Sequence, residues 1–498
     1  MFRKILVANR GEIAVRVLRT CREMGIGTVA VYSDVDRLAL HVRMADEAYA
    51  IGPAPASESY LRMDKILDVA KKAGADAIHP GYGFLSESPD FARACAQAGV
   101  KLIGPSAEAM GLLGDKLAAK KTVAGVGVAL APGTTEPVED EVQLQREAQR
   151  IGFPLLVKAA AGGGGKGIHE VHQPEELGAA LRLSQGEAQA AFGDKRVFLE
   201  RLVERPRHVE VQVLADEHGN CIHLGERECS VQRRHQKLIE ESPSVAVTPE
   251  LRQRMGAAAV AAAKAAGYTN AGTVEFLLDQ SGEFYFLEVN TRLQVEHPVT
   301  EWLTGLDLVR EQIRIAAGEK LGLGQEDVTW RGAAIECRIT AEDPDLQFLP
   351  FTGTALDVSE PSGPGVRFDH MLHPGVEVTR YYDSLLGKLI VWAQDRPAAI
   401  ERMRRALGEL RIPGLKTTIP FHAWAMANDA FRKGELHTGF IAEHWRPAES
   451  DAGAQEVAAI AIAVLELQRG ARPAAPEDGR PSVEASKWKL AARAAIAR

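Results

Sequence analysis

The first 104 residues alternate short apolar runs with stretches of helical periodicity, and this alternation restricts the fold more than any other feature of the sequence. Turn-forming residues separate the two kinds of segment, as is typical of strands that alternate with helices. Such strands form a parallel sheet with helices on its faces. The predicted strands are residues 4–8, 28–33, 48–52, 75–80 and 100–104. The N-terminal part is therefore predicted to be a doubly wound parallel-sheet α/β domain.

The first strand-to-helix turn, residues 9–14, reads Asn-Arg-Gly-Glu-Ile-Ala and lacks the glycine fingerprint of dinucleotide-binding sites. We expect a Rossmann-like shape there without nucleotide binding at that turn. Residues from about 114 to 320 have a mixed α and β pattern, and residues 330–446 return to short strands, followed by a helix around 397–410. A chain of 498 residues is too long for one ordinary core, so two to four domains are expected.

The bulk composition excludes several classes of protein. A formal net charge of −8 provides no basic excess for nucleic acid. The five cysteines are scattered, odd in number and form no Cys-x-x-Cys pair, which indicates reduced thiols in a cytosolic protein. The N-terminus has too short an apolar run for a signal peptide, and the alanine-rich run at 256–266 is too short to span a bilayer. We therefore expect a cytoplasmic protein that binds neither nucleic acid nor a membrane.

A run of glycines at residues 162–167, which includes Lys166, can turn its backbone amides toward an anion and approach phosphate oxygens closely. It is not a P-loop, because no Ser or Thr follows Lys166. Lys158 precedes the run at the end of a strand-like segment, and Lys116 is a second candidate for a phosphate-binding cation. The alternative is a surface turn with solvated lysines.

The strongest signal lies in residues 272–301, where two apolar runs flank Gln280-Ser281-Gly282-Glu283 and predict a hairpin. With the turn centred there, Glu275 and Glu288 fall opposite one another. Facing carboxylates repel unless a cation lies between them. Magnesium fits such a site, because it takes one or two carboxylates together with phosphate oxygens.

Beyond Glu288, strand periodicity puts Asn290, Arg292, Gln294 and Glu296 on the same face. Pro298 then opens a helix, whose N-terminus favours anions. A solvated sheet face is the alternative, but it does not explain the pair of acids across the hairpin.

Residues 224–244 concentrate basic side chains and predict a loop that binds an anion such as polyphosphate or bicarbonate. The basic and amide side chains of this segment are Arg227, Gln232, Arg233, Arg234, His235 and Lys237. The alternative is an exposed charge run offset by Glu240 and Glu241.

Taken together, these segments resemble the biotin carboxylase family of the ATP-grasp superfamily. The resemblance runs from residue 1 to about 446 and rests on the combination of motifs, since the glycine run alone is weak. The motifs are ILVANRGEIAVR, IHPGYGFLSE, GGGGKG, ECSVQRRHQKLIEE, FLEVNTRLQVEHPVTE, ECRITAEDP and YYDSLLGKLI.

The resemblance implies three domains, at 1–113 (N-terminal), 114–320 (ATP-grasp) and 330–446 (C-terminal biotin carboxylase domain). Within the second, about 131–204 would form a mobile lid. The residues implied to bind ATP are Lys116, Lys158, Gly162, Gly163, Gly164, Gly165, Lys166, Gly167, His208, Gln232 and His235, with Glu200 and Val203 near the adenine. Those implied to hold Mg²⁺, or Mn²⁺, are Glu275, Glu288 and Asn290. Those implied to hold bicarbonate are Lys237, Arg292, Gln294 and Val295.

The same resemblance implies that Glu296 deprotonates bicarbonate and that Arg338 steadies the biotin ureido oxygen. The reaction would be ATP-dependent carboxylation of biotin through carboxyphosphate, as the first half-reaction of a biotin-dependent carboxylase. No AMKM-like attachment sequence is present. We therefore expect a separate biotin carboxyl carrier protein and a separate carboxyltransferase, and the resemblance also implies a homodimeric subunit.

Two departures from the family pattern are present. The family commonly has arginine at Lys166, and Ser-Pro-Gly where this chain has Phe351-Thr352-Gly353. Residues 450–498 have no counterpart in the shortest members; they are predicted to form a helical tail, a candidate for partner docking, with an amphipathic stretch at 457–465. The acceptor is not evident: acetyl-CoA, as in fatty acid biosynthesis, propionyl-CoA and pyruvate are all compatible.

Two other functions compete with this one. Another ATP-grasp ligase, of the carbamoyl-phosphate or purine-synthesis type, would share the magnesium hairpin but not the run from Arg292 to His297, nor Arg338 in its context. A non-catalytic ATP-binding scaffold would not need Lys237, Arg292 and Glu296.

Overall fold

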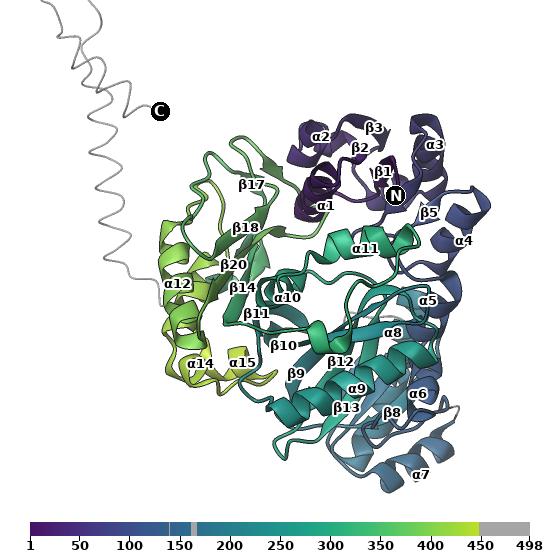
Figure 1. The fold of residues 1–498 in the computed structure, drawn as a ribbon. Coiled ribbons are helices and arrows are strands. Elements are labelled where there is room, and N and C mark those ends of the chain that lie inside the picture. Colours follow the sequence, from purple (N-terminus) through teal and green to yellow (C-terminus); the bar gives the residue numbers. More distant parts are fainter. Residues whose placement is uncertain (139, 161–166, 448–498) are drawn as a thin grey trace, which may run out of the picture. The chain divides into compact units, whose positions relative to one another are not determined.

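In the computed structural model, the N-terminal apolar runs form a parallel sheet with the order β3-β2-β1-β4-β5 (Figure 1). The strands are β1 (Lys4–Val7), β2 (Gly27–Ser33), β3 (Glu47–Gly52), β4 (Ala77–His79) and β5 (Lys101–Leu102). The helices between them are α1 (Gly11–Glu23), α2 (Leu40–Met44), α3 (Met63–Ala73) and α4 (Pro89–Gln97). All neighbouring strands are parallel, so the predicted α/β domain is confirmed.

The structure describes residues 1–138, 140–160 and 167–447. Gly162, Gly163, Gly164, Gly165 and Lys166 lie outside these residues, as does the predicted tail at 450–498. Met1–Trp445 forms one compact unit.

A second sheet has eight strands in the order β13-β12-β9-β10-β11-β14-β20-β18, and all its neighbours are antiparallel. Its strands are β9 (Arg207–Ala215), β10 (Cys221–Arg233), β11 (Gln236–Ser242), β12 (Asn270–Leu278), β13 (Phe284–Asn290), β14 (Ala333–Thr340), β18 (Val366–His370) and β20 (Leu385–Ala393). The β11–β14 pairing, with Glu240 opposite Glu336, joins strands from the 114–320 and 330–446 regions. One continuous sheet thus runs through both regions (Figure 1).

Helices pack against this sheet and close its apolar cores. Helix α9 contacts β9, β10 and β12, and α12 contacts β14 and β20. The helices of this part are α5 (Ala107–Gly114), α6 (Lys116–Ala124), α9 (Pro249–Ala265), α10 (His297–Thr304), α11 (Leu308–Ala316), α12 (Arg396–Glu409), α13 (Ile419–Ala427), α14 (Asp429–Lys433) and α15 (Phe440–His444). The helix predicted around 397–410 is therefore α12.

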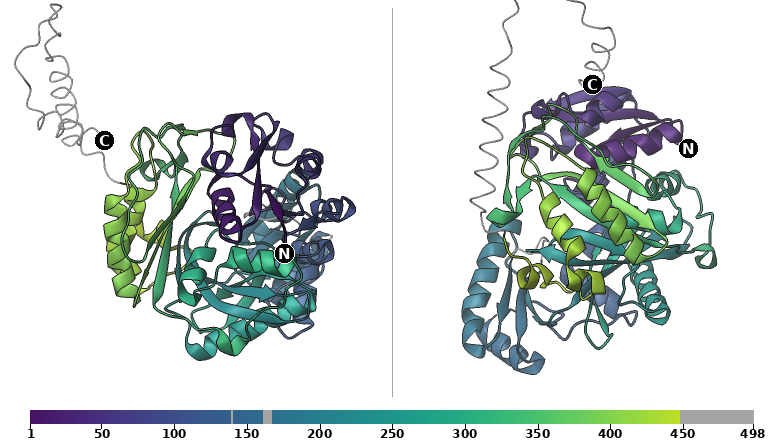
Figure 2. Two further views of the ribbon diagram at one scale, coloured as in Figure 1. Left: turned by 45° about the horizontal axis from the view of Figure 1, so that its top comes forward. Right: turned by 90° about the vertical axis from the view of Figure 1, so that its left-hand side faces the viewer.

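A smaller sheet with the order β7-β6-β8 occupies the region expected to form the lid, drawn in blue at the lower left of the right-hand view in Figure 2. Its elements are α7 (Glu141–Ile151), β6 (Leu155–Ala159), β7 (Ile168–Val171), α8 (Leu177–Phe192) and β8 (Val197–Arg201). It has its own apolar core, which includes Leu144, Val157 and Leu181. A separate core allows this segment to keep its shape as a unit.

Two short pairings follow β14 in the chain: β15 (Glu342–Asp343) with β16 (Leu349–Pro350), and β17 (Gly353–Thr354) with β19 (Glu377–Val378). In the Phe351-Thr352-Gly353 departure, the first two residues connect β16 to β17 and Gly353 begins β17. Within the described residues, no helix combines the length and the apolar character that crossing a bilayer requires.

Candidate functional site

The hairpin predicted in residues 272–301 is formed by β12 and β13, and Glu275 lies directly opposite Glu288 in its register. Its turn is closed by a 2.9 Å hydrogen bond from the Asp279 amide to the Glu283 carbonyl. Asn290, the last residue of β13, donates its side-chain amide to Glu275 Oε1 at 2.9 Å. The predicted facing of the two acids is confirmed.

The strand does not continue to Glu296 as the periodicity predicted. Strand β13 ends at Asn290, and residues 291–296 are irregular up to Glu296, the N-cap of α10. The prediction of a continuous strand was wrong because the chain must leave the sheet to begin the helix that Pro298 opens. The N-terminus of that helix does lie where predicted.

Lys237 on β11 is the centre of a buried charge cluster. Its Nζ atom lies 2.5 Å from Glu210 Oε2, 2.8 Å from Glu275 Oε1 and 2.7 Å from Glu296 Oε1. Burial lowers the pKa of this amine, but the three carboxylates outweigh burial and raise it well above its ordinary value. Lys237 is therefore a permanent cation that links three strands and the N-cap of α10.

Arg338 on β14 joins Glu296 from the other side. Its Nη2 atom lies 3.0 Å from Glu296 Oε2, and its Nε donates to Glu240 Oε1 at 2.6 Å. Burial raises the pKa of Glu296, yet Lys237, Arg338 and Arg227 together hold it well below its ordinary value. Glu296 is thus an ionised carboxylate between two cations, ready to accept a proton when those cations are drawn to other anions.

Arg292 brings the irregular segment back toward the sheet. Its Nε donates to Glu87 at 2.9 Å, its Nη2 to Asn290 Oδ1 at 3.2 Å and its Nη1 to Gln294 Oε1 at 3.2 Å. Gln294 in turn lies 3.5 Å from Glu275 Oε1. The side chains of Asn290, Arg292, Gln294 and Glu296 therefore gather around Glu275, even though the strand that was expected to align them ends early.

Two features bear on the predicted metal site. Glu275 accepts from His208 Nε2 at 2.9 Å as well as from Lys237, and these partners overcome burial to lower its pKa. Glu288 is about one-third exposed and lies 3.6 Å from the Lys116 amine. The facing carboxylates and the Asn290 oxygen are the hard ligands that Mg²⁺ prefers, so the residues present fit that ion.

On the side of the smaller sheet, Glu200 on β8 holds two buried lysines. Lys158 on β6 lies 3.2 Å from Glu200 Oε1, and Lys120 on α6 pairs with Oε2. Burial raises the pKa of Glu200, but Lys158 and Lys120 outweigh it and bring the pKa to about 2. Glu200 therefore organises positive charge next to the strand end from which the glycine run leaves.

The remaining predicted residues lie on several different elements. His235 lies at the tip of the β10–β11 hairpin, and partial desolvation of its ring, followed by the charge of Lys158, lowers its pKa. Gln232 pairs with Lys237 in that hairpin, Val203 follows β8 and is half-buried, and the Val295 carbonyl accepts from Lys388 at 2.5 Å.

Gly167, the described end of the glycine run, is buried with φ +71°, a left-handed conformation that favours glycine. A Cβ atom there would lie 2.9 Å from the Ala159 side chain.

The basic segment at 224–244 is not a loop. Residues 221–233 and 236–242 are the strands of the β10–β11 hairpin, and only Arg234 and His235 lie at its tip, both with positive φ. Arg227 is fully buried and pairs with Glu210, while Glu240 and Glu241 are buried as well. The loop prediction was wrong, and the exposed-charge alternative fails for Arg227 and Lys237, because these two are buried against Glu210 on the neighbouring part of the sheet.

Sequence reasoning assigned no role in the site to four charged residues that complete the cluster. They are Glu87, Lys120 on α6, Glu210 on β9 and Glu240 on β11. The signal for Glu210 was its position in a β-branched strand, where a buried carboxylate needs a cation. Sequence alone does not reveal which cation that is.

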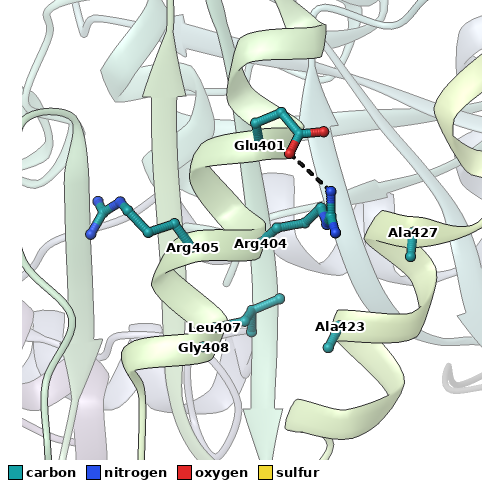
Figure 3. A pocket seen from close by; sticks show the side chains of 7 residues that line it. All are labelled: Glu401, Arg404, Arg405, Leu407, Gly408, Ala423 and Ala427. Atoms are coloured by element: carbon teal, nitrogen blue, oxygen red, sulfur yellow. Dashed lines mark hydrogen bonds and ion pairs between the residues drawn. The ribbon is translucent and has the colours of Figure 1, made fainter.

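A surface hollow of about 490 Å³ lies elsewhere, between α12 and α13. Figure 3 shows small residues, Ala423 and Ala427, on one side and the Glu401–Arg404 ion pair on the other. None of its lining residues belongs to the buried charge cluster.

Family models match nearly the whole of the described chain. The matches are "Biotin carboxylase, N-terminal domain" over residues 1–110, "Carbamoyl-phosphate synthase L chain, ATP binding domain" over 115–323 and "Biotin carboxylase C-terminal domain" over 336–443.

Curated relatives are similar over nine tenths of the chain. A pyruvate carboxylase subunit of Methanothermobacter thermautotrophicus is 56% identical over 451 residues, which are 91% of this chain and 92% of that protein. The biotin carboxylase of Nostoc sp. is 55% identical over 442 residues, 89% of this chain and 99% of that protein.

Solved structures share the fold. The biotin carboxylase domain dimer of Hydrogenobacter thermophilus 2-oxoglutarate carboxylase, in complex with MgADP, ADP and bicarbonate, has a TM-score of 0.87 at 50% identity and covers 89% of this chain and 98% of its own. The biotin carboxylase β-γ-ATP complex from Campylobacter jejuni has a TM-score of 0.87 at 47% identity, covering 89% and 99%.

Proposed function

The chain belongs to the biotin carboxylase family of ATP-dependent ligases, and from this premise we propose how its residues carboxylate biotin with ATP and bicarbonate. The observation that carries the proposal is the ionised Glu296 held between Lys237 and Arg338. A carboxylate between two cations suits a reaction that brings two anions together and removes a proton from one of them.

In this proposal bicarbonate binds to Lys237, Arg292, Gln294 and the Val295 backbone. As the anion engages Lys237, this lysine neutralises Glu296 less, and the affinity of Glu296 for a proton rises. Glu296 then takes the bicarbonate proton while the bicarbonate oxygen attacks the terminal phosphate of ATP. The products of this step are carboxyphosphate and ADP.

ATP would be bound by Lys116, Lys158, His208, Gln232, His235 and the glycine run at 162–167, with Glu200 and Val203 beside the adenine. Glu275, Glu288 and Asn290 would hold Mg²⁺, or Mn²⁺, which neutralises charge on the phosphates when bound. The Lys158–Glu200–Lys120 group supports a phosphate-binding role, since its two cations lie beside the start of the glycine run. Closure of residues 131–204 as a lid would keep water from the intermediate.

Carboxyphosphate would release carbon dioxide beside biotin, and the phosphate would remove the ureido proton. Arg338 would stabilise the negative charge that develops on the ureido oxygen. Its place at the edge of the Glu296 cluster, with the side chain 13% exposed, supports a role at a point that a second substrate can reach.

We further propose that the biotin belongs to a separate carrier protein, that a carboxyltransferase subunit completes the reaction, and that the chain is a cytoplasmic homodimer. The dimeric Hydrogenobacter structure and the relationship to subunits of multi-subunit carboxylases support this. Acetyl-CoA carboxylase, which would place the chain in fatty acid biosynthesis, is one setting; carboxylases for propionyl-CoA and pyruvate are the others.

The domain limits proposed are 1–113, 114–320 and 330–446, with 450–498 as a segment for docking the carrier or carboxyltransferase. Its apolar positions at 457–465 and its basic end, SKWKLAARAAIAR, support that role. Deletion of 450–498 should leave carboxylation of free biotin nearly intact and weaken co-purification with those subunits. Equal co-purification would contradict docking.

The deciding assay is ATP hydrolysis with Mg²⁺ and bicarbonate, with and without free biotin. We expect clear stimulation by biotin. A folded, ATP-binding protein without that stimulation would contradict the proposal.

A further inference from the structure

Two buried carboxylates share Arg338, and both contact its Nη2 atom. Glu240 Oε1 lies 2.6 Å from Nε and 2.5 Å from Nη2, and Glu296 Oε2 lies 3.0 Å from Nη2. Both carboxylates are fully buried, whereas Arg338 reaches the edge of the cluster. Glu240 therefore holds the Nε–Nη2 edge of the guanidinium, and Glu296 adds a second, longer contact at Nη2.

The two acids differ in their other partners. Glu296 also accepts from Lys237 at 2.7 Å. The second oxygen of Glu240 is buried and has no hydrogen-bond partner within residues 1–138, 140–160 and 167–447. Arg338 is the one cation paired with Glu240 in that part of the chain. Among the described residues, Glu240 therefore forms an ion pair with Arg338 alone, whereas Glu296 forms ion pairs with both Lys237 and Arg338.

Glu336, the neighbour of Glu240 across the sheet, offers no cation that would compete with Arg338 for Glu240. Glu336 on β14 lies opposite Glu240, fully buried, and among the described residues neither of its carboxyl oxygens has a hydrogen-bond partner. Burial raises the pKa of Glu336 well above its ordinary value, which favours its neutral form. Burial also raises the pKa of Glu240, to about 7, against the effect of Arg338, and the charge on Glu296 contributes to the rise. A neutral Glu296 would therefore leave Glu240 more fully ionised.

We propose that Glu240 is the positioning residue that keeps Arg338 in place while Glu296 accepts the bicarbonate proton. In that step the O–H bond of bicarbonate breaks, the proton joins a Glu296 oxygen, and the electron pair stays on the attacking oxygen. Glu296 then has no charge with which to hold Nη2. Because Glu240 still holds Nε and Nη2, the N–H of Nη2 that faced Glu296 becomes free for the biotin ureido oxygen without loss of the orientation of Arg338.

This arrangement implies that bicarbonate reacts before biotin engages Arg338. The inference rests on the roles proposed above for Glu296 and Arg338. Arg338 is occupied by Glu296 until bicarbonate has been deprotonated, and it becomes available to biotin afterwards. Removal of the charge at Glu240 should therefore impair the biotin step and spare the bicarbonate step.

The test is Glu240→Gln in the full chain, which retains an acceptor oxygen but lacks the charge. We expect the KM for free biotin to rise by roughly 10- to 100-fold, the range for loss of a charge-assisted hydrogen bond. Bicarbonate-dependent ATP hydrolysis without biotin should stay within about threefold of wild type. The matched control is Glu336→Gln, which replaces a buried acid that has no hydrogen-bond partner among the described residues and should change neither value.

Each outcome bears on the inference. An unchanged biotin KM would overturn it, and so would an equal fall of both activities, which would make Glu240 a general structural residue. If Glu240→Gln does not fold, Glu240→Asp serves, because its shorter carboxylate cannot reach Nε and should give the same selective loss. Biotin stimulation of the wild-type protein is measured in parallel. Its absence would contradict the proposed function. Its presence, together with an unchanged biotin KM in Glu240→Gln, would contradict this inference alone.

Discussion

Lys237 Nζ and Glu296 Oε1 lie 2.7 Å apart although 59 residues separate them in the chain. The first is on β11, and the second caps α10 after the hairpin strand β13 has ended. The pair keeps Glu296 ionised in the absence of substrate, since burial alone would favour its neutral form. The proton acceptor is thus prepared by the same lysine that is proposed to bind bicarbonate.

Replacement of Glu296 by Gln should lower turnover by roughly two to four orders of magnitude, because a carboxamide cannot accept the bicarbonate proton. ATP affinity, measured by calorimetric titration, should barely change. A collapse of ATP binding together with turnover would instead make Glu296 a structural or metal-binding residue.

Replacement of Glu288 by Lys should abolish Mg²⁺-dependent ATP binding and leave the unliganded fold intact. Glu288 is about one-third exposed, so a lysine can be accommodated, but it brings a positive charge opposite Glu275. The matched control is Glu283→Lys, at the exposed turn of the same hairpin. Loss of the fold in the Glu288 variant, without an effect on metal dependence, would contradict the metal site.

Replacement of Arg227 by Met should cost about 3–5 kcal/mol in the free energy of unfolding, measured with urea. Arg227 is fully buried and bonded to Glu210, Gln212, Thr273 and Thr300. The exposed Arg93→Met, which breaks the Asp90 pair, should cost less than about 1 kcal/mol. Similar costs for the two variants would show that the buried network contributes little.

Stability should fall as the pH drops from 6.5 toward 4, partly through His79. Burial lowers the pKa of this fully buried imidazole from 6.5 to about 4, so the unfolded chain binds a proton that the folded chain excludes. The stabilisation is complete above pH 6.5 and lost progressively below it, by up to about 1.4 kcal/mol per pH unit. His79→Gln should flatten the dependence of the unfolding free energy between pH 7 and 5. Parallel curves for the two proteins would contradict this.

Local periodicity was enough to predict the N-terminal sheet and the hairpin, because both depend on residues close in sequence. It failed beyond Asn290, where strand spacing continues in the sequence but the chain turns into α10. It also failed for residues 224–244, where charge density suggested a loop. The acids that form ion pairs with those buried cations, such as Glu210, lie on other strands. No local sequence pattern identifies which cation each acid will pair with.

The continuous eight-stranded sheet determines where the polypeptide can be divided. A fragment ending before Ala333 would keep β11 but lose β14, and would leave the backbone groups of Ile239–Ser242 that face β14 unpaired along an open edge. Such an edge is a template for pairing with another chain, so this fragment should self-associate instead of remaining monomeric. The complementary fragment, beginning at β14, would carry the matching edge. Co-expression of the two halves is therefore the condition under which either should remain in solution.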